Sequence, residues 1–188
     1  KYNSSGVKQW TQQLGTSSQD HGLGVSVDSS DNIYVMGYTY GGGLDGNTNA
    51  GGTDTFLVKY NPSGTKQWTQ QLGSTAKDLG TGMVVDSSNN IYVSGFTYGG
   101  LDGNTNSGSS DAFMVKYNSS GTKQWTQQLG TSSKDIARSM EVDSSDNIYV
   151  TGYTEGSIDG NTNSGGMDLF LFKFISSGSN HRNLLLGT

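Results

Sequence analysis

The sequence predicts an all-β fold built from a repeated unit, and three observations carry this prediction. Tryptophan recurs with spacings of 58 and 57 residues, at Trp10, Trp68 and Trp125. Each unit contains four short segments that are rich in β-branched and aromatic residues and are separated by turn residues. No segment shows a sustained helical period. Self-similarity of this length is typical of stacked or radially arranged units.

In the first complete unit we expect strands at 24–28, 33–39, 55–61 and 66–72. A turn at 28–32 joins the first two, and the turn Asn61-Pro62-Ser63-Gly64 joins the last two. Four antiparallel strands per repeat of 57–58 residues predict β-propeller-type blades. A β-solenoid, such as a parallel β-helix, is the alternative fold, but the hairpin turns argue against it.

The strand patterns indicate where each strand lies in a blade. In the third strand, Phe56 and Val58 face one way and Leu57 the other, so both faces are apolar. This pattern suits a strand packed between two neighbouring blades. One face of the fourth strand carries only polar residues, Gln67, Thr69 and Gln71. The fourth strand is therefore expected at the outer, half-solvated edge.

The repeats divide the chain into four parts. We interpret 1–19 as the two C-terminal strands of a preceding blade, 20–77 and 78–134 as blade repeats, and 135–188 as a divergent terminal blade repeat. About three units cannot close a ring, because propellers typically have about 4–8 blades. We therefore expect the chain to associate with copies of itself or to belong to a longer repeat chain.

Composition narrows the classes of partner and location. Only 14% of the residues are charged, the net charge is −5, and Lys and Arg form no cluster, so nucleic acid is not an expected partner. No apolar run is long enough to predict membrane insertion. The absence of Cys excludes disulfides and thiolate metal sites. Abundant small polar residues with few charges are common in bacterial secreted and cell-surface proteins, which is the location we expect.

Two stretches resemble a known family, the bacterial β-propeller repeat called SBBP. They are Asp-Ala-Phe-Met-Val-Lys-Tyr-Asn-Ser-Ser-Gly at 111–121 and Val-Asp-Ser-Ser-Asp-Asn-Ile-Tyr-Val-Thr-Gly-Tyr at 142–153. The resemblance covers essentially the whole chain, weakens after Ile175, and implies a propeller fold without a common chemistry. The segment 117–125 is also similar to an element of quinoprotein propellers in which Trp docks one blade on the next. That similarity implies a docking role for Trp10, Trp68 and Trp125.

The strongest candidate for a ligand site is an Asp-x-Asn-x-Asn loop, followed in each unit by a further Asp. Oxygen side chains at alternate positions are what calcium prefers, since it takes 6–8 oxygen ligands. The pattern lacks the Gly and the bidentate Glu of an EF-hand. The alternative is that these residues are ordinary turn formers and that the last Asp caps the third strand. The candidate metal ligands are Asp45, Asn47, Asn49, Asp54, Asp102, Asn104, Asn106, Asp111, Asp159, Asn161, Asn163 and Asp168.

A second repeated acidic set is Asp20, Asp78 and Asp135, each eight residues before the Asp that ends the following strand. These carboxylates either line a channel mouth or, as we favour, bond backbone amides at the entry to the innermost strand. His21 and His181 are the only histidines, and neither belongs to a repeated motif, so no catalytic residue is predicted.

Two further features were considered as binding or catalytic positions. Glu141 replaces Ser26 and Val84 on the expected innermost strand. Five aromatic residues near loop-facing strand ends suit either a lectin-like or peptide-binding face or packing between blades: Tyr38, Tyr40, Phe96, Tyr98 and Tyr153.

The sequence therefore predicts a secreted or cell-surface module for binding, self-assembly or scaffolding, stabilised by calcium, rather than an enzyme. Near-identical blades present near-identical loops, which suits multivalent contact with a protein or glycan ligand. Two alternatives stay open. One is an enzyme, hydrolase or quinoprotein-like, with its site at the channel mouth, and the other is a carbohydrate-binding, lectin-like module.

Overall fold

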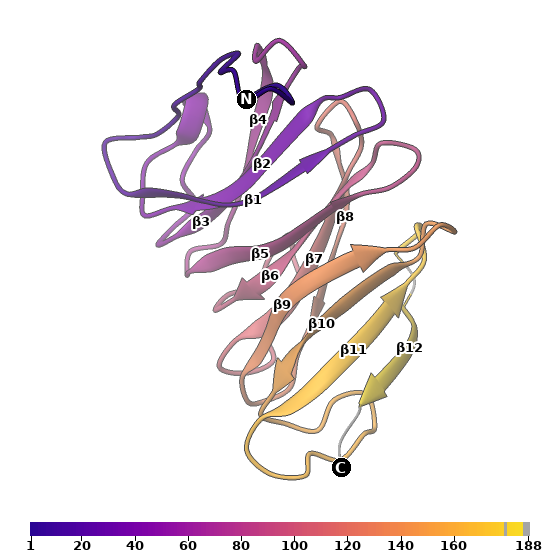
Figure 1. Ribbon diagram of the computed structural model, residues 1–188. Helices are drawn as coiled ribbons and strands as arrows, with labels where there is room; N and C mark the ends of the chain where they lie inside the picture. Colours follow the sequence, from indigo (N-terminus) through magenta and orange to yellow (C-terminus); the bar gives the residue numbers. More distant parts are fainter. Residues whose placement is uncertain (179, 186–188) are drawn as a thin grey trace.

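The computed structural model describes residues 1–178 and the backbone of 180–185, and this part of the chain forms three antiparallel sheets of four strands each (Figure 1). Blade 1 consists of β1 (Asp20–Val27), β2 (Ile33–Thr39), β3 (Asp54–Tyr60) and β4 (Lys66–Leu72). Blade 2 consists of β5 (Asp78–Val85), β6 (Ile91–Thr97), β7 (Asp111–Tyr117) and β8 (Lys123–Leu129). Blade 3 consists of β9 (Asp135–Val142), β10 (Ile148–Thr154), β11 (Asp168–Phe174) and β12 (Asn180–Leu185).

The strands of each blade follow one another in chain order, as hairpin turns dictate. The first strands of successive blades, β1, β5 and β9, contact one another along one side of the array. Figure 1 shows the three blades side by side in chain order, as an open arrangement and not a closed ring. In the described residues, parallel pairing is limited to the isolated bridges Thr53↔Lys77 and Ser110↔Lys134. The parallel β-helix alternative is therefore not the fold seen here.

The strand bounds agree with the sequence prediction to within one residue, except at the start of the first strand of the blade. β1 begins at Asp20, four residues before the predicted start, and Asp20 pairs with Thr39. A bulge between Gly22 and Gly24 interrupts the register, so the simple alternation that marks a strand in sequence is lost there. The alternation of apolar and polar residues therefore did not predict that β1 begins at Asp20.

The hydrophobic core lies between blades rather than inside one. Tyr34, Met36 and Leu57 of blade 1 belong to one buried cluster with Ile91 and Val93 of blade 2. A second cluster joins blades 2 and 3 in the same way. The expectation that the third strand is apolar on both faces because it lies between neighbours is confirmed at β7. Phe113 and Val115 belong to the cluster shared with blade 1, and Ala112 and Met114 to the cluster shared with blade 3.

The fourth strands β4 and β8 lie at the outer edge of their sheets, as predicted. Their amide side chains do more than face solvent. The Gln71 Oε1 accepts the Leu44 N–H at 2.9 Å, and its Nε2 donates to Asp54 at 3.0 Å. Gln128 makes the equivalent contacts in blade 2. The edge strand thus holds the long loop between the second and third strands, which includes the 3₁₀ turn η1 (Leu44–Gly46) of blade 1.

Residues 1–19 differ from the predicted strand pair, because they form only the isolated antiparallel bridge Tyr2↔Lys8. Only Lys1 and Tyr2 correspond to the end of a third strand, so the segment 8–14 has too short a neighbour to form a ladder. The segment still occupies the place of an outer strand. The Trp10 Nε1 donates to the carbonyl of Pro62 at 3.2 Å, in the last turn of blade 1.

Candidate functional site

Each described seam between blades is fastened by a Trp and a Lys that reach the next blade. The Trp68 Nε1 and the Lys59 Nζ both donate to the Ser119 carbonyl, at 3.4 and 3.0 Å. At the following seam, Lys116 Nζ donates to the Ser176 carbonyl at 2.8 Å, and the Trp125 ring lies against Gly178. This arrangement agrees with the docking role that the resemblance implied for the tryptophans. Sequence reasoning missed the lysines, although their fixed place in every repeat was a signal.

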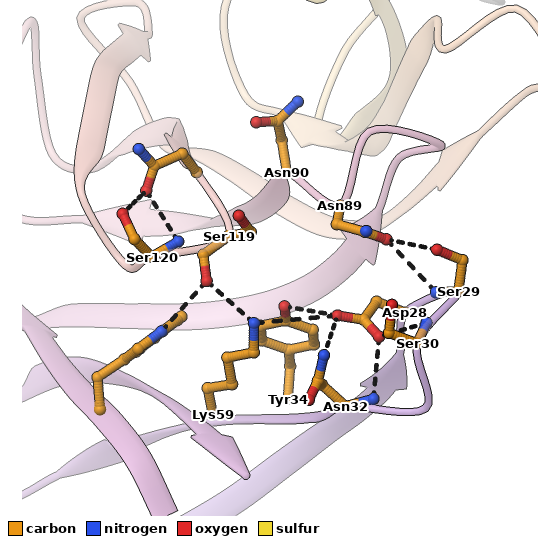
Figure 2. A network of polar contacts seen from close by, with 12 residues as sticks. Asp28, Ser29, Ser30, Asn32, Tyr34, Lys59, Asn89, Asn90, Ser119 and Ser120 are labelled. Carbon is orange, nitrogen blue, oxygen red and sulfur yellow. Dashed lines mark hydrogen bonds and ion pairs between the residues drawn. The ribbon is translucent and has the colours of Figure 1, made fainter. Parts of the chain in front are cut away.

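The turns between the first and second strands form a polar network at the same seams (Figure 2). Asp28 accepts hydrogen bonds from the backbone of Ser30 and Asn32 and from the Tyr34 hydroxyl, which lies 2.9 Å away. Burial raises the pKa of Asp28, but these hydrogen bonds outweigh it and hold the pKa below its ordinary value. The Ser29 hydroxyl crosses to Asn89 of the next turn at 3.0 Å. The network therefore aligns successive blades.

The predicted metal loops are held together by hydrogen bonds within the loop and to the edge strand. The Asp45 carboxylate binds Lys66 Nζ and Thr69 Oγ1, and the Asp102 carboxylate binds the equivalent Lys123 and Thr126. Burial raises the pKa of Asp45, but the hydrogen bonds from Lys66 and Thr69 together lower it by more. The pKa of Asp45 therefore lies below its ordinary value.

The amides of the same loops are engaged in turn geometry. In blade 1, Asn47 Nδ2 donates to the Leu44 carbonyl at 2.7 Å, and Asn49 Oδ1 accepts the Gly51 N–H at 3.1 Å. The same two contacts recur at Asn104, Asn106, Asn161 and Asn163.

The last Asp of each loop accepts a backbone N–H four residues earlier. The donors are Ala50 for Asp54, Ser107 for Asp111 and Ser164 for Asp168, at 2.8, 2.9 and 2.6 Å. The predicted ligands of one loop thus have different hydrogen-bond partners. Across the residues that the structure describes, no group of three or more His, Cys, Asp and Glu side chains could hold a metal ion. Calcium binding by the twelve-residue set, half of which are Asn side chains, stays a prediction.

The second acidic set occupies the entries to the innermost strands, and the favoured interpretation is confirmed. Asp20, Asp78 and Asp135 each accept a backbone N–H, from Thr16, Ser74 and Thr131, in every case at 2.6 Å. Asp78 and Asp135 are fully buried. Burial raises the pKa of Asp78, and the nearby Asp54 carboxylate raises it further.

His21 of β1 and Glu141 of β9 are both exposed. His21 stacks on Tyr38 with ring centroids 4.9 Å apart. Arg138, on the same strand as Glu141, lies over the Tyr153 ring at 5.5 Å. Tyr40 and Tyr98 are exposed, and each packs edge-on against the neighbouring aromatic, Tyr38 or Phe96. The side chain of His181 lies outside the described residues.

An open groove lies on the free face of blade 1. We call it the blade 1 groove; its volume is about 830 Å³. Its floor consists of apolar residues of β2 and β3, and its rim includes Trp10 and Leu14 of the N-terminal segment. The residues of its floor are Ile33, Val35, Phe56, Val58 and Tyr60. Val25 and Val27 of β1 add exposed apolar surface beside it.

Blades of four antiparallel strands, stacked through Trp and Lys contacts, define a β-propeller repeat protein. The SBBP model, described as a β-propeller repeat, matches residues 9–45, 67–102 and 124–165, and the chain belongs to this family. None of the helices in the described residues is long and apolar enough to cross a membrane.

Two curated relatives show low identity. An uncharacterized WD repeat-containing protein, L264, of Acanthamoeba polyphaga mimivirus is 27% identical over 199 residues, which cover 86% of this chain and 14% of that protein. The regulatory protein FlaEY of Caulobacter vibrioides is 28% identical over 171 residues, which cover 82% of this chain and 18% of that protein. The chain thus spans less than a fifth of the length of either relative.

One solved structure, a protein of unknown function from Bacteroides caccae, matches with a TM-score of 0.46 at 8% identity. The match covers 88% of this chain and 61% of that one.

Proposed function

We propose that this chain is a non-catalytic interaction module whose free blade faces stack on further blades of the same repeat. One observation carries the proposal. The five residues on the floor of the blade 1 groove have equivalents in blade 2 that are covered by blade 1. Ile91 and Val93 of blade 2 are at most 1% exposed, whereas their equivalents Ile33 and Val35 in the groove are only half-buried. Phe56, Val58 and Tyr60 are already buried within the chain. The difference at Ile33 and Val35 supports the interpretation of the groove as a blade seam without its second half.

The opposite end of the array presents the other half of such a seam. Tyr34 and Leu57 of blade 1 fill the seam with blade 2. Their equivalents in blade 3, Tyr149 and Leu171, are only half-buried, and Leu169 beside them is 46% exposed. The exposure of these residues supports a fit between the two free faces of the chain. A head-to-tail contact of this kind is heterologous and either closes into a ring or continues as a filament.

The N-terminal segment supports a blade as the occupant of the groove. Trp10 contacts Gly64 and the Pro62 carbonyl just as Trp68 contacts Gly121 and the Ser119 carbonyl. The outer strand position of a preceding blade is therefore already filled, and the groove lies where the remaining strands of that blade would pack. Two copies of three blades supply six, within the usual range of about 4–8 for a closed propeller. In a longer chain, neighbouring blades of the same chain would take the same places.

A secreted or cell-surface location is also part of the proposal, and its support is the composition of the chain. The proposed role in assembly does not depend on this location.

The test is the native mass of the 19.9 kDa chain by sedimentation velocity over a range of protein concentrations. For the wild type, we expect species with multiples of the monomer mass, and their fraction should increase with protein concentration. The substitution Val35→Glu places a charge on the half-buried floor of the groove and should return the protein to a monomer. Tyr98→Glu adds the same charge at an exposed site of blade 2 and should leave assembly unchanged. A wild type that stays monomeric at every concentration, or equal masses for both variants, would refute the proposal.

A further inference from the structure

The seam between blades 2 and 3 contains three buried oxygen atoms that have no hydrogen-bond partner in the described chain. They are Asp111 Oδ1, Asp135 Oδ1 and Ser110 Oγ. All three residues are almost completely buried, at 1%, 0% and 0% exposure. Buried polar atoms in proteins are nearly always hydrogen-bonded or bound to an ion or a water molecule. Three such atoms from neighbouring residues therefore need a common explanation.

The three residues lie where β7 and β9 begin: Asp111 is the first residue of β7, Ser110 precedes it, and Asp135 is the first residue of β9. The Asp135 N–H donates to the Ser110 carbonyl at 2.8 Å, beside the parallel bridge Ser110↔Lys134. The two carboxylates lie against the same short segment. Asp111 Oδ1 lies only 2.1 Å from where a Cβ on Gly130 would be, and Asp135 Oδ2 accepts the next N–H, that of Thr131.

The remaining oxygens of these carboxylates are satisfied, so only one side of each is open. Asp111 Oδ2 accepts the Ser107 N–H and the Gln128 Nε2–H, at 2.9 and 3.0 Å. No hydrogen-bond partner reaches the open oxygens from the described residues. A group bound between them would supply the missing contacts.

The charge of the cluster identifies the chemistry of that group. Two carboxylates are buried here, and the ion pairs of the described residues involve other acids, namely Asp28, Asp45 and Asp102. Buried charges in proteins are paired or coordinate metals, and a water molecule alone would leave both charges uncompensated. Two carboxylates and a hydroxyl are ligands that suit a hard divalent cation.

We propose that Ser110, Asp111 and Asp135 bind one calcium ion in the seam between blades 2 and 3. Only Asp111 is shared with the loop set predicted from the sequence, and the ion lies between blades instead of within a loop. The seam between blades 1 and 2 provides a natural comparison. There, Asp54 Oδ1 is also unpartnered, but the Asp78 Oδ1 accepts the Thr97 hydroxyl and is not available.

The test uses the 188-residue chain after treatment with a chelator, titrated with calcium chloride. We expect equilibrium dialysis to detect a bound ion and the midpoint of thermal unfolding to rise with calcium concentration. Asp135→Asn keeps an acceptor for the Thr131 N–H but removes one charge, so the calcium-dependent rise should disappear. Asp78→Asn makes the same change at the other seam, and the rise should persist.

A second variant distinguishes a hydroxyl that binds calcium from one that is merely buried without a partner, because the two predict opposite changes in the unfolding midpoint. Ser110→Ala removes a hydroxyl that has no protein partner, so without calcium it should leave the unfolding midpoint unchanged or raise it. With calcium it should lower the affinity severalfold and reduce the midpoint relative to wild type. Ser94→Ala removes another unpartnered buried hydroxyl, away from this cluster, so the calcium-dependent rise should persist and the effect of the substitution should be the same with and without calcium. Absence of a calcium effect in the wild type, or an equal effect in all four variants, would overturn the proposal.

Discussion

The Trp68 ring lies directly on the Cα of Gly121 in the next blade. A Cβ on Gly121 would lie 2.8 Å from Trp68 Cδ2, and the Gly121 backbone has a φ of +83°. The same contact joins Trp10 to Gly64 and Trp125 to Gly178. The turn between the third and fourth strands of each blade thus packs against the Trp of the preceding repeat.

This contact predicts a strong effect of Gly121→Ala. The positive φ costs about 1–2 kcal/mol for a residue with a side chain, and displacing the Trp68 ring adds about 1–3 kcal/mol. Gly103→Ala is a matched control, because Gly103 has the same φ of +83° but no atom within 4 Å of its Cβ position. We expect urea unfolding to show a clearly larger loss for Gly121→Ala. Equal losses would mean that the ring contact contributes nothing.

The buried hydroxyl of Tyr34 predicts a graded series of Tyr→Phe substitutions. Tyr34 and Tyr92 are fully buried and donate to Asp28 and Asp86 at 2.9 and 3.0 Å. Losing a hydrogen bond to a charged group should cost about 1.5–3 kcal/mol. Tyr149 makes the same contact with Asp143 but is only partly buried on the free face of blade 3, so Tyr149→Phe should cost less. Urea unfolding of the three variants checks this order, and a cost at Tyr149 equal to that at Tyr34 would contradict it.

Asp143 predicts a loss of stability in acid. Hydrogen bonds lower the pKa of Asp143 from 3.8 to about 2. The largest effects come from the side chain and backbone of Asn147, and Ser145 and Tyr149 supply the rest. Because the folded pKa lies below the unfolded value, Asp143 contributes stability above about pH 4 that is lost as the pH falls toward 2. Urea unfolding at pH 5 and pH 3 should show a weaker pH dependence for Asp143→Asn than for wild type. A carboxyl pKa near 4 in an NMR titration would contradict this account.

The sequence was most informative within a blade. The strands at Ile33–Thr39 and Lys66–Leu72 agree with the prediction to the residue, because hairpin turns and local alternation define them. The capping role of Asp54 was also among the predicted alternatives. Contacts between blades were harder to predict, since residues such as Lys59 and Ser119 are 60 positions apart and meet only once the blades are stacked. The cluster of Ser110, Asp111 and Asp135 was hidden for the same reason, because its members belong to separate motifs.

The central claim is that a third seam, equivalent to the two observed, forms between blade 3 of one copy and blade 1 of another. The bridges Thr53↔Lys77 and Ser110↔Lys134 mark the observed seams, and the equivalent pair at the third is Met167 and Gln19. Residues in such a bridge are close enough for a disulfide. The chain has no cysteine, so a double variant Gln19→Cys and Met167→Cys reports on this contact alone.

Non-reducing electrophoresis of this double variant after mild oxidation is the most direct measurement. Thr53→Cys with Lys77→Cys is the control, since it should close a disulfide within one chain and leave the mass at that of a monomer. The account predicts a covalent dimer, or higher multiples, for the Gln19 and Met167 pair, and its loss when Val35→Glu is added. A variant that stays monomeric with free thiols, while the control oxidises fully, would contradict the proposed stacking of blade 3 on blade 1.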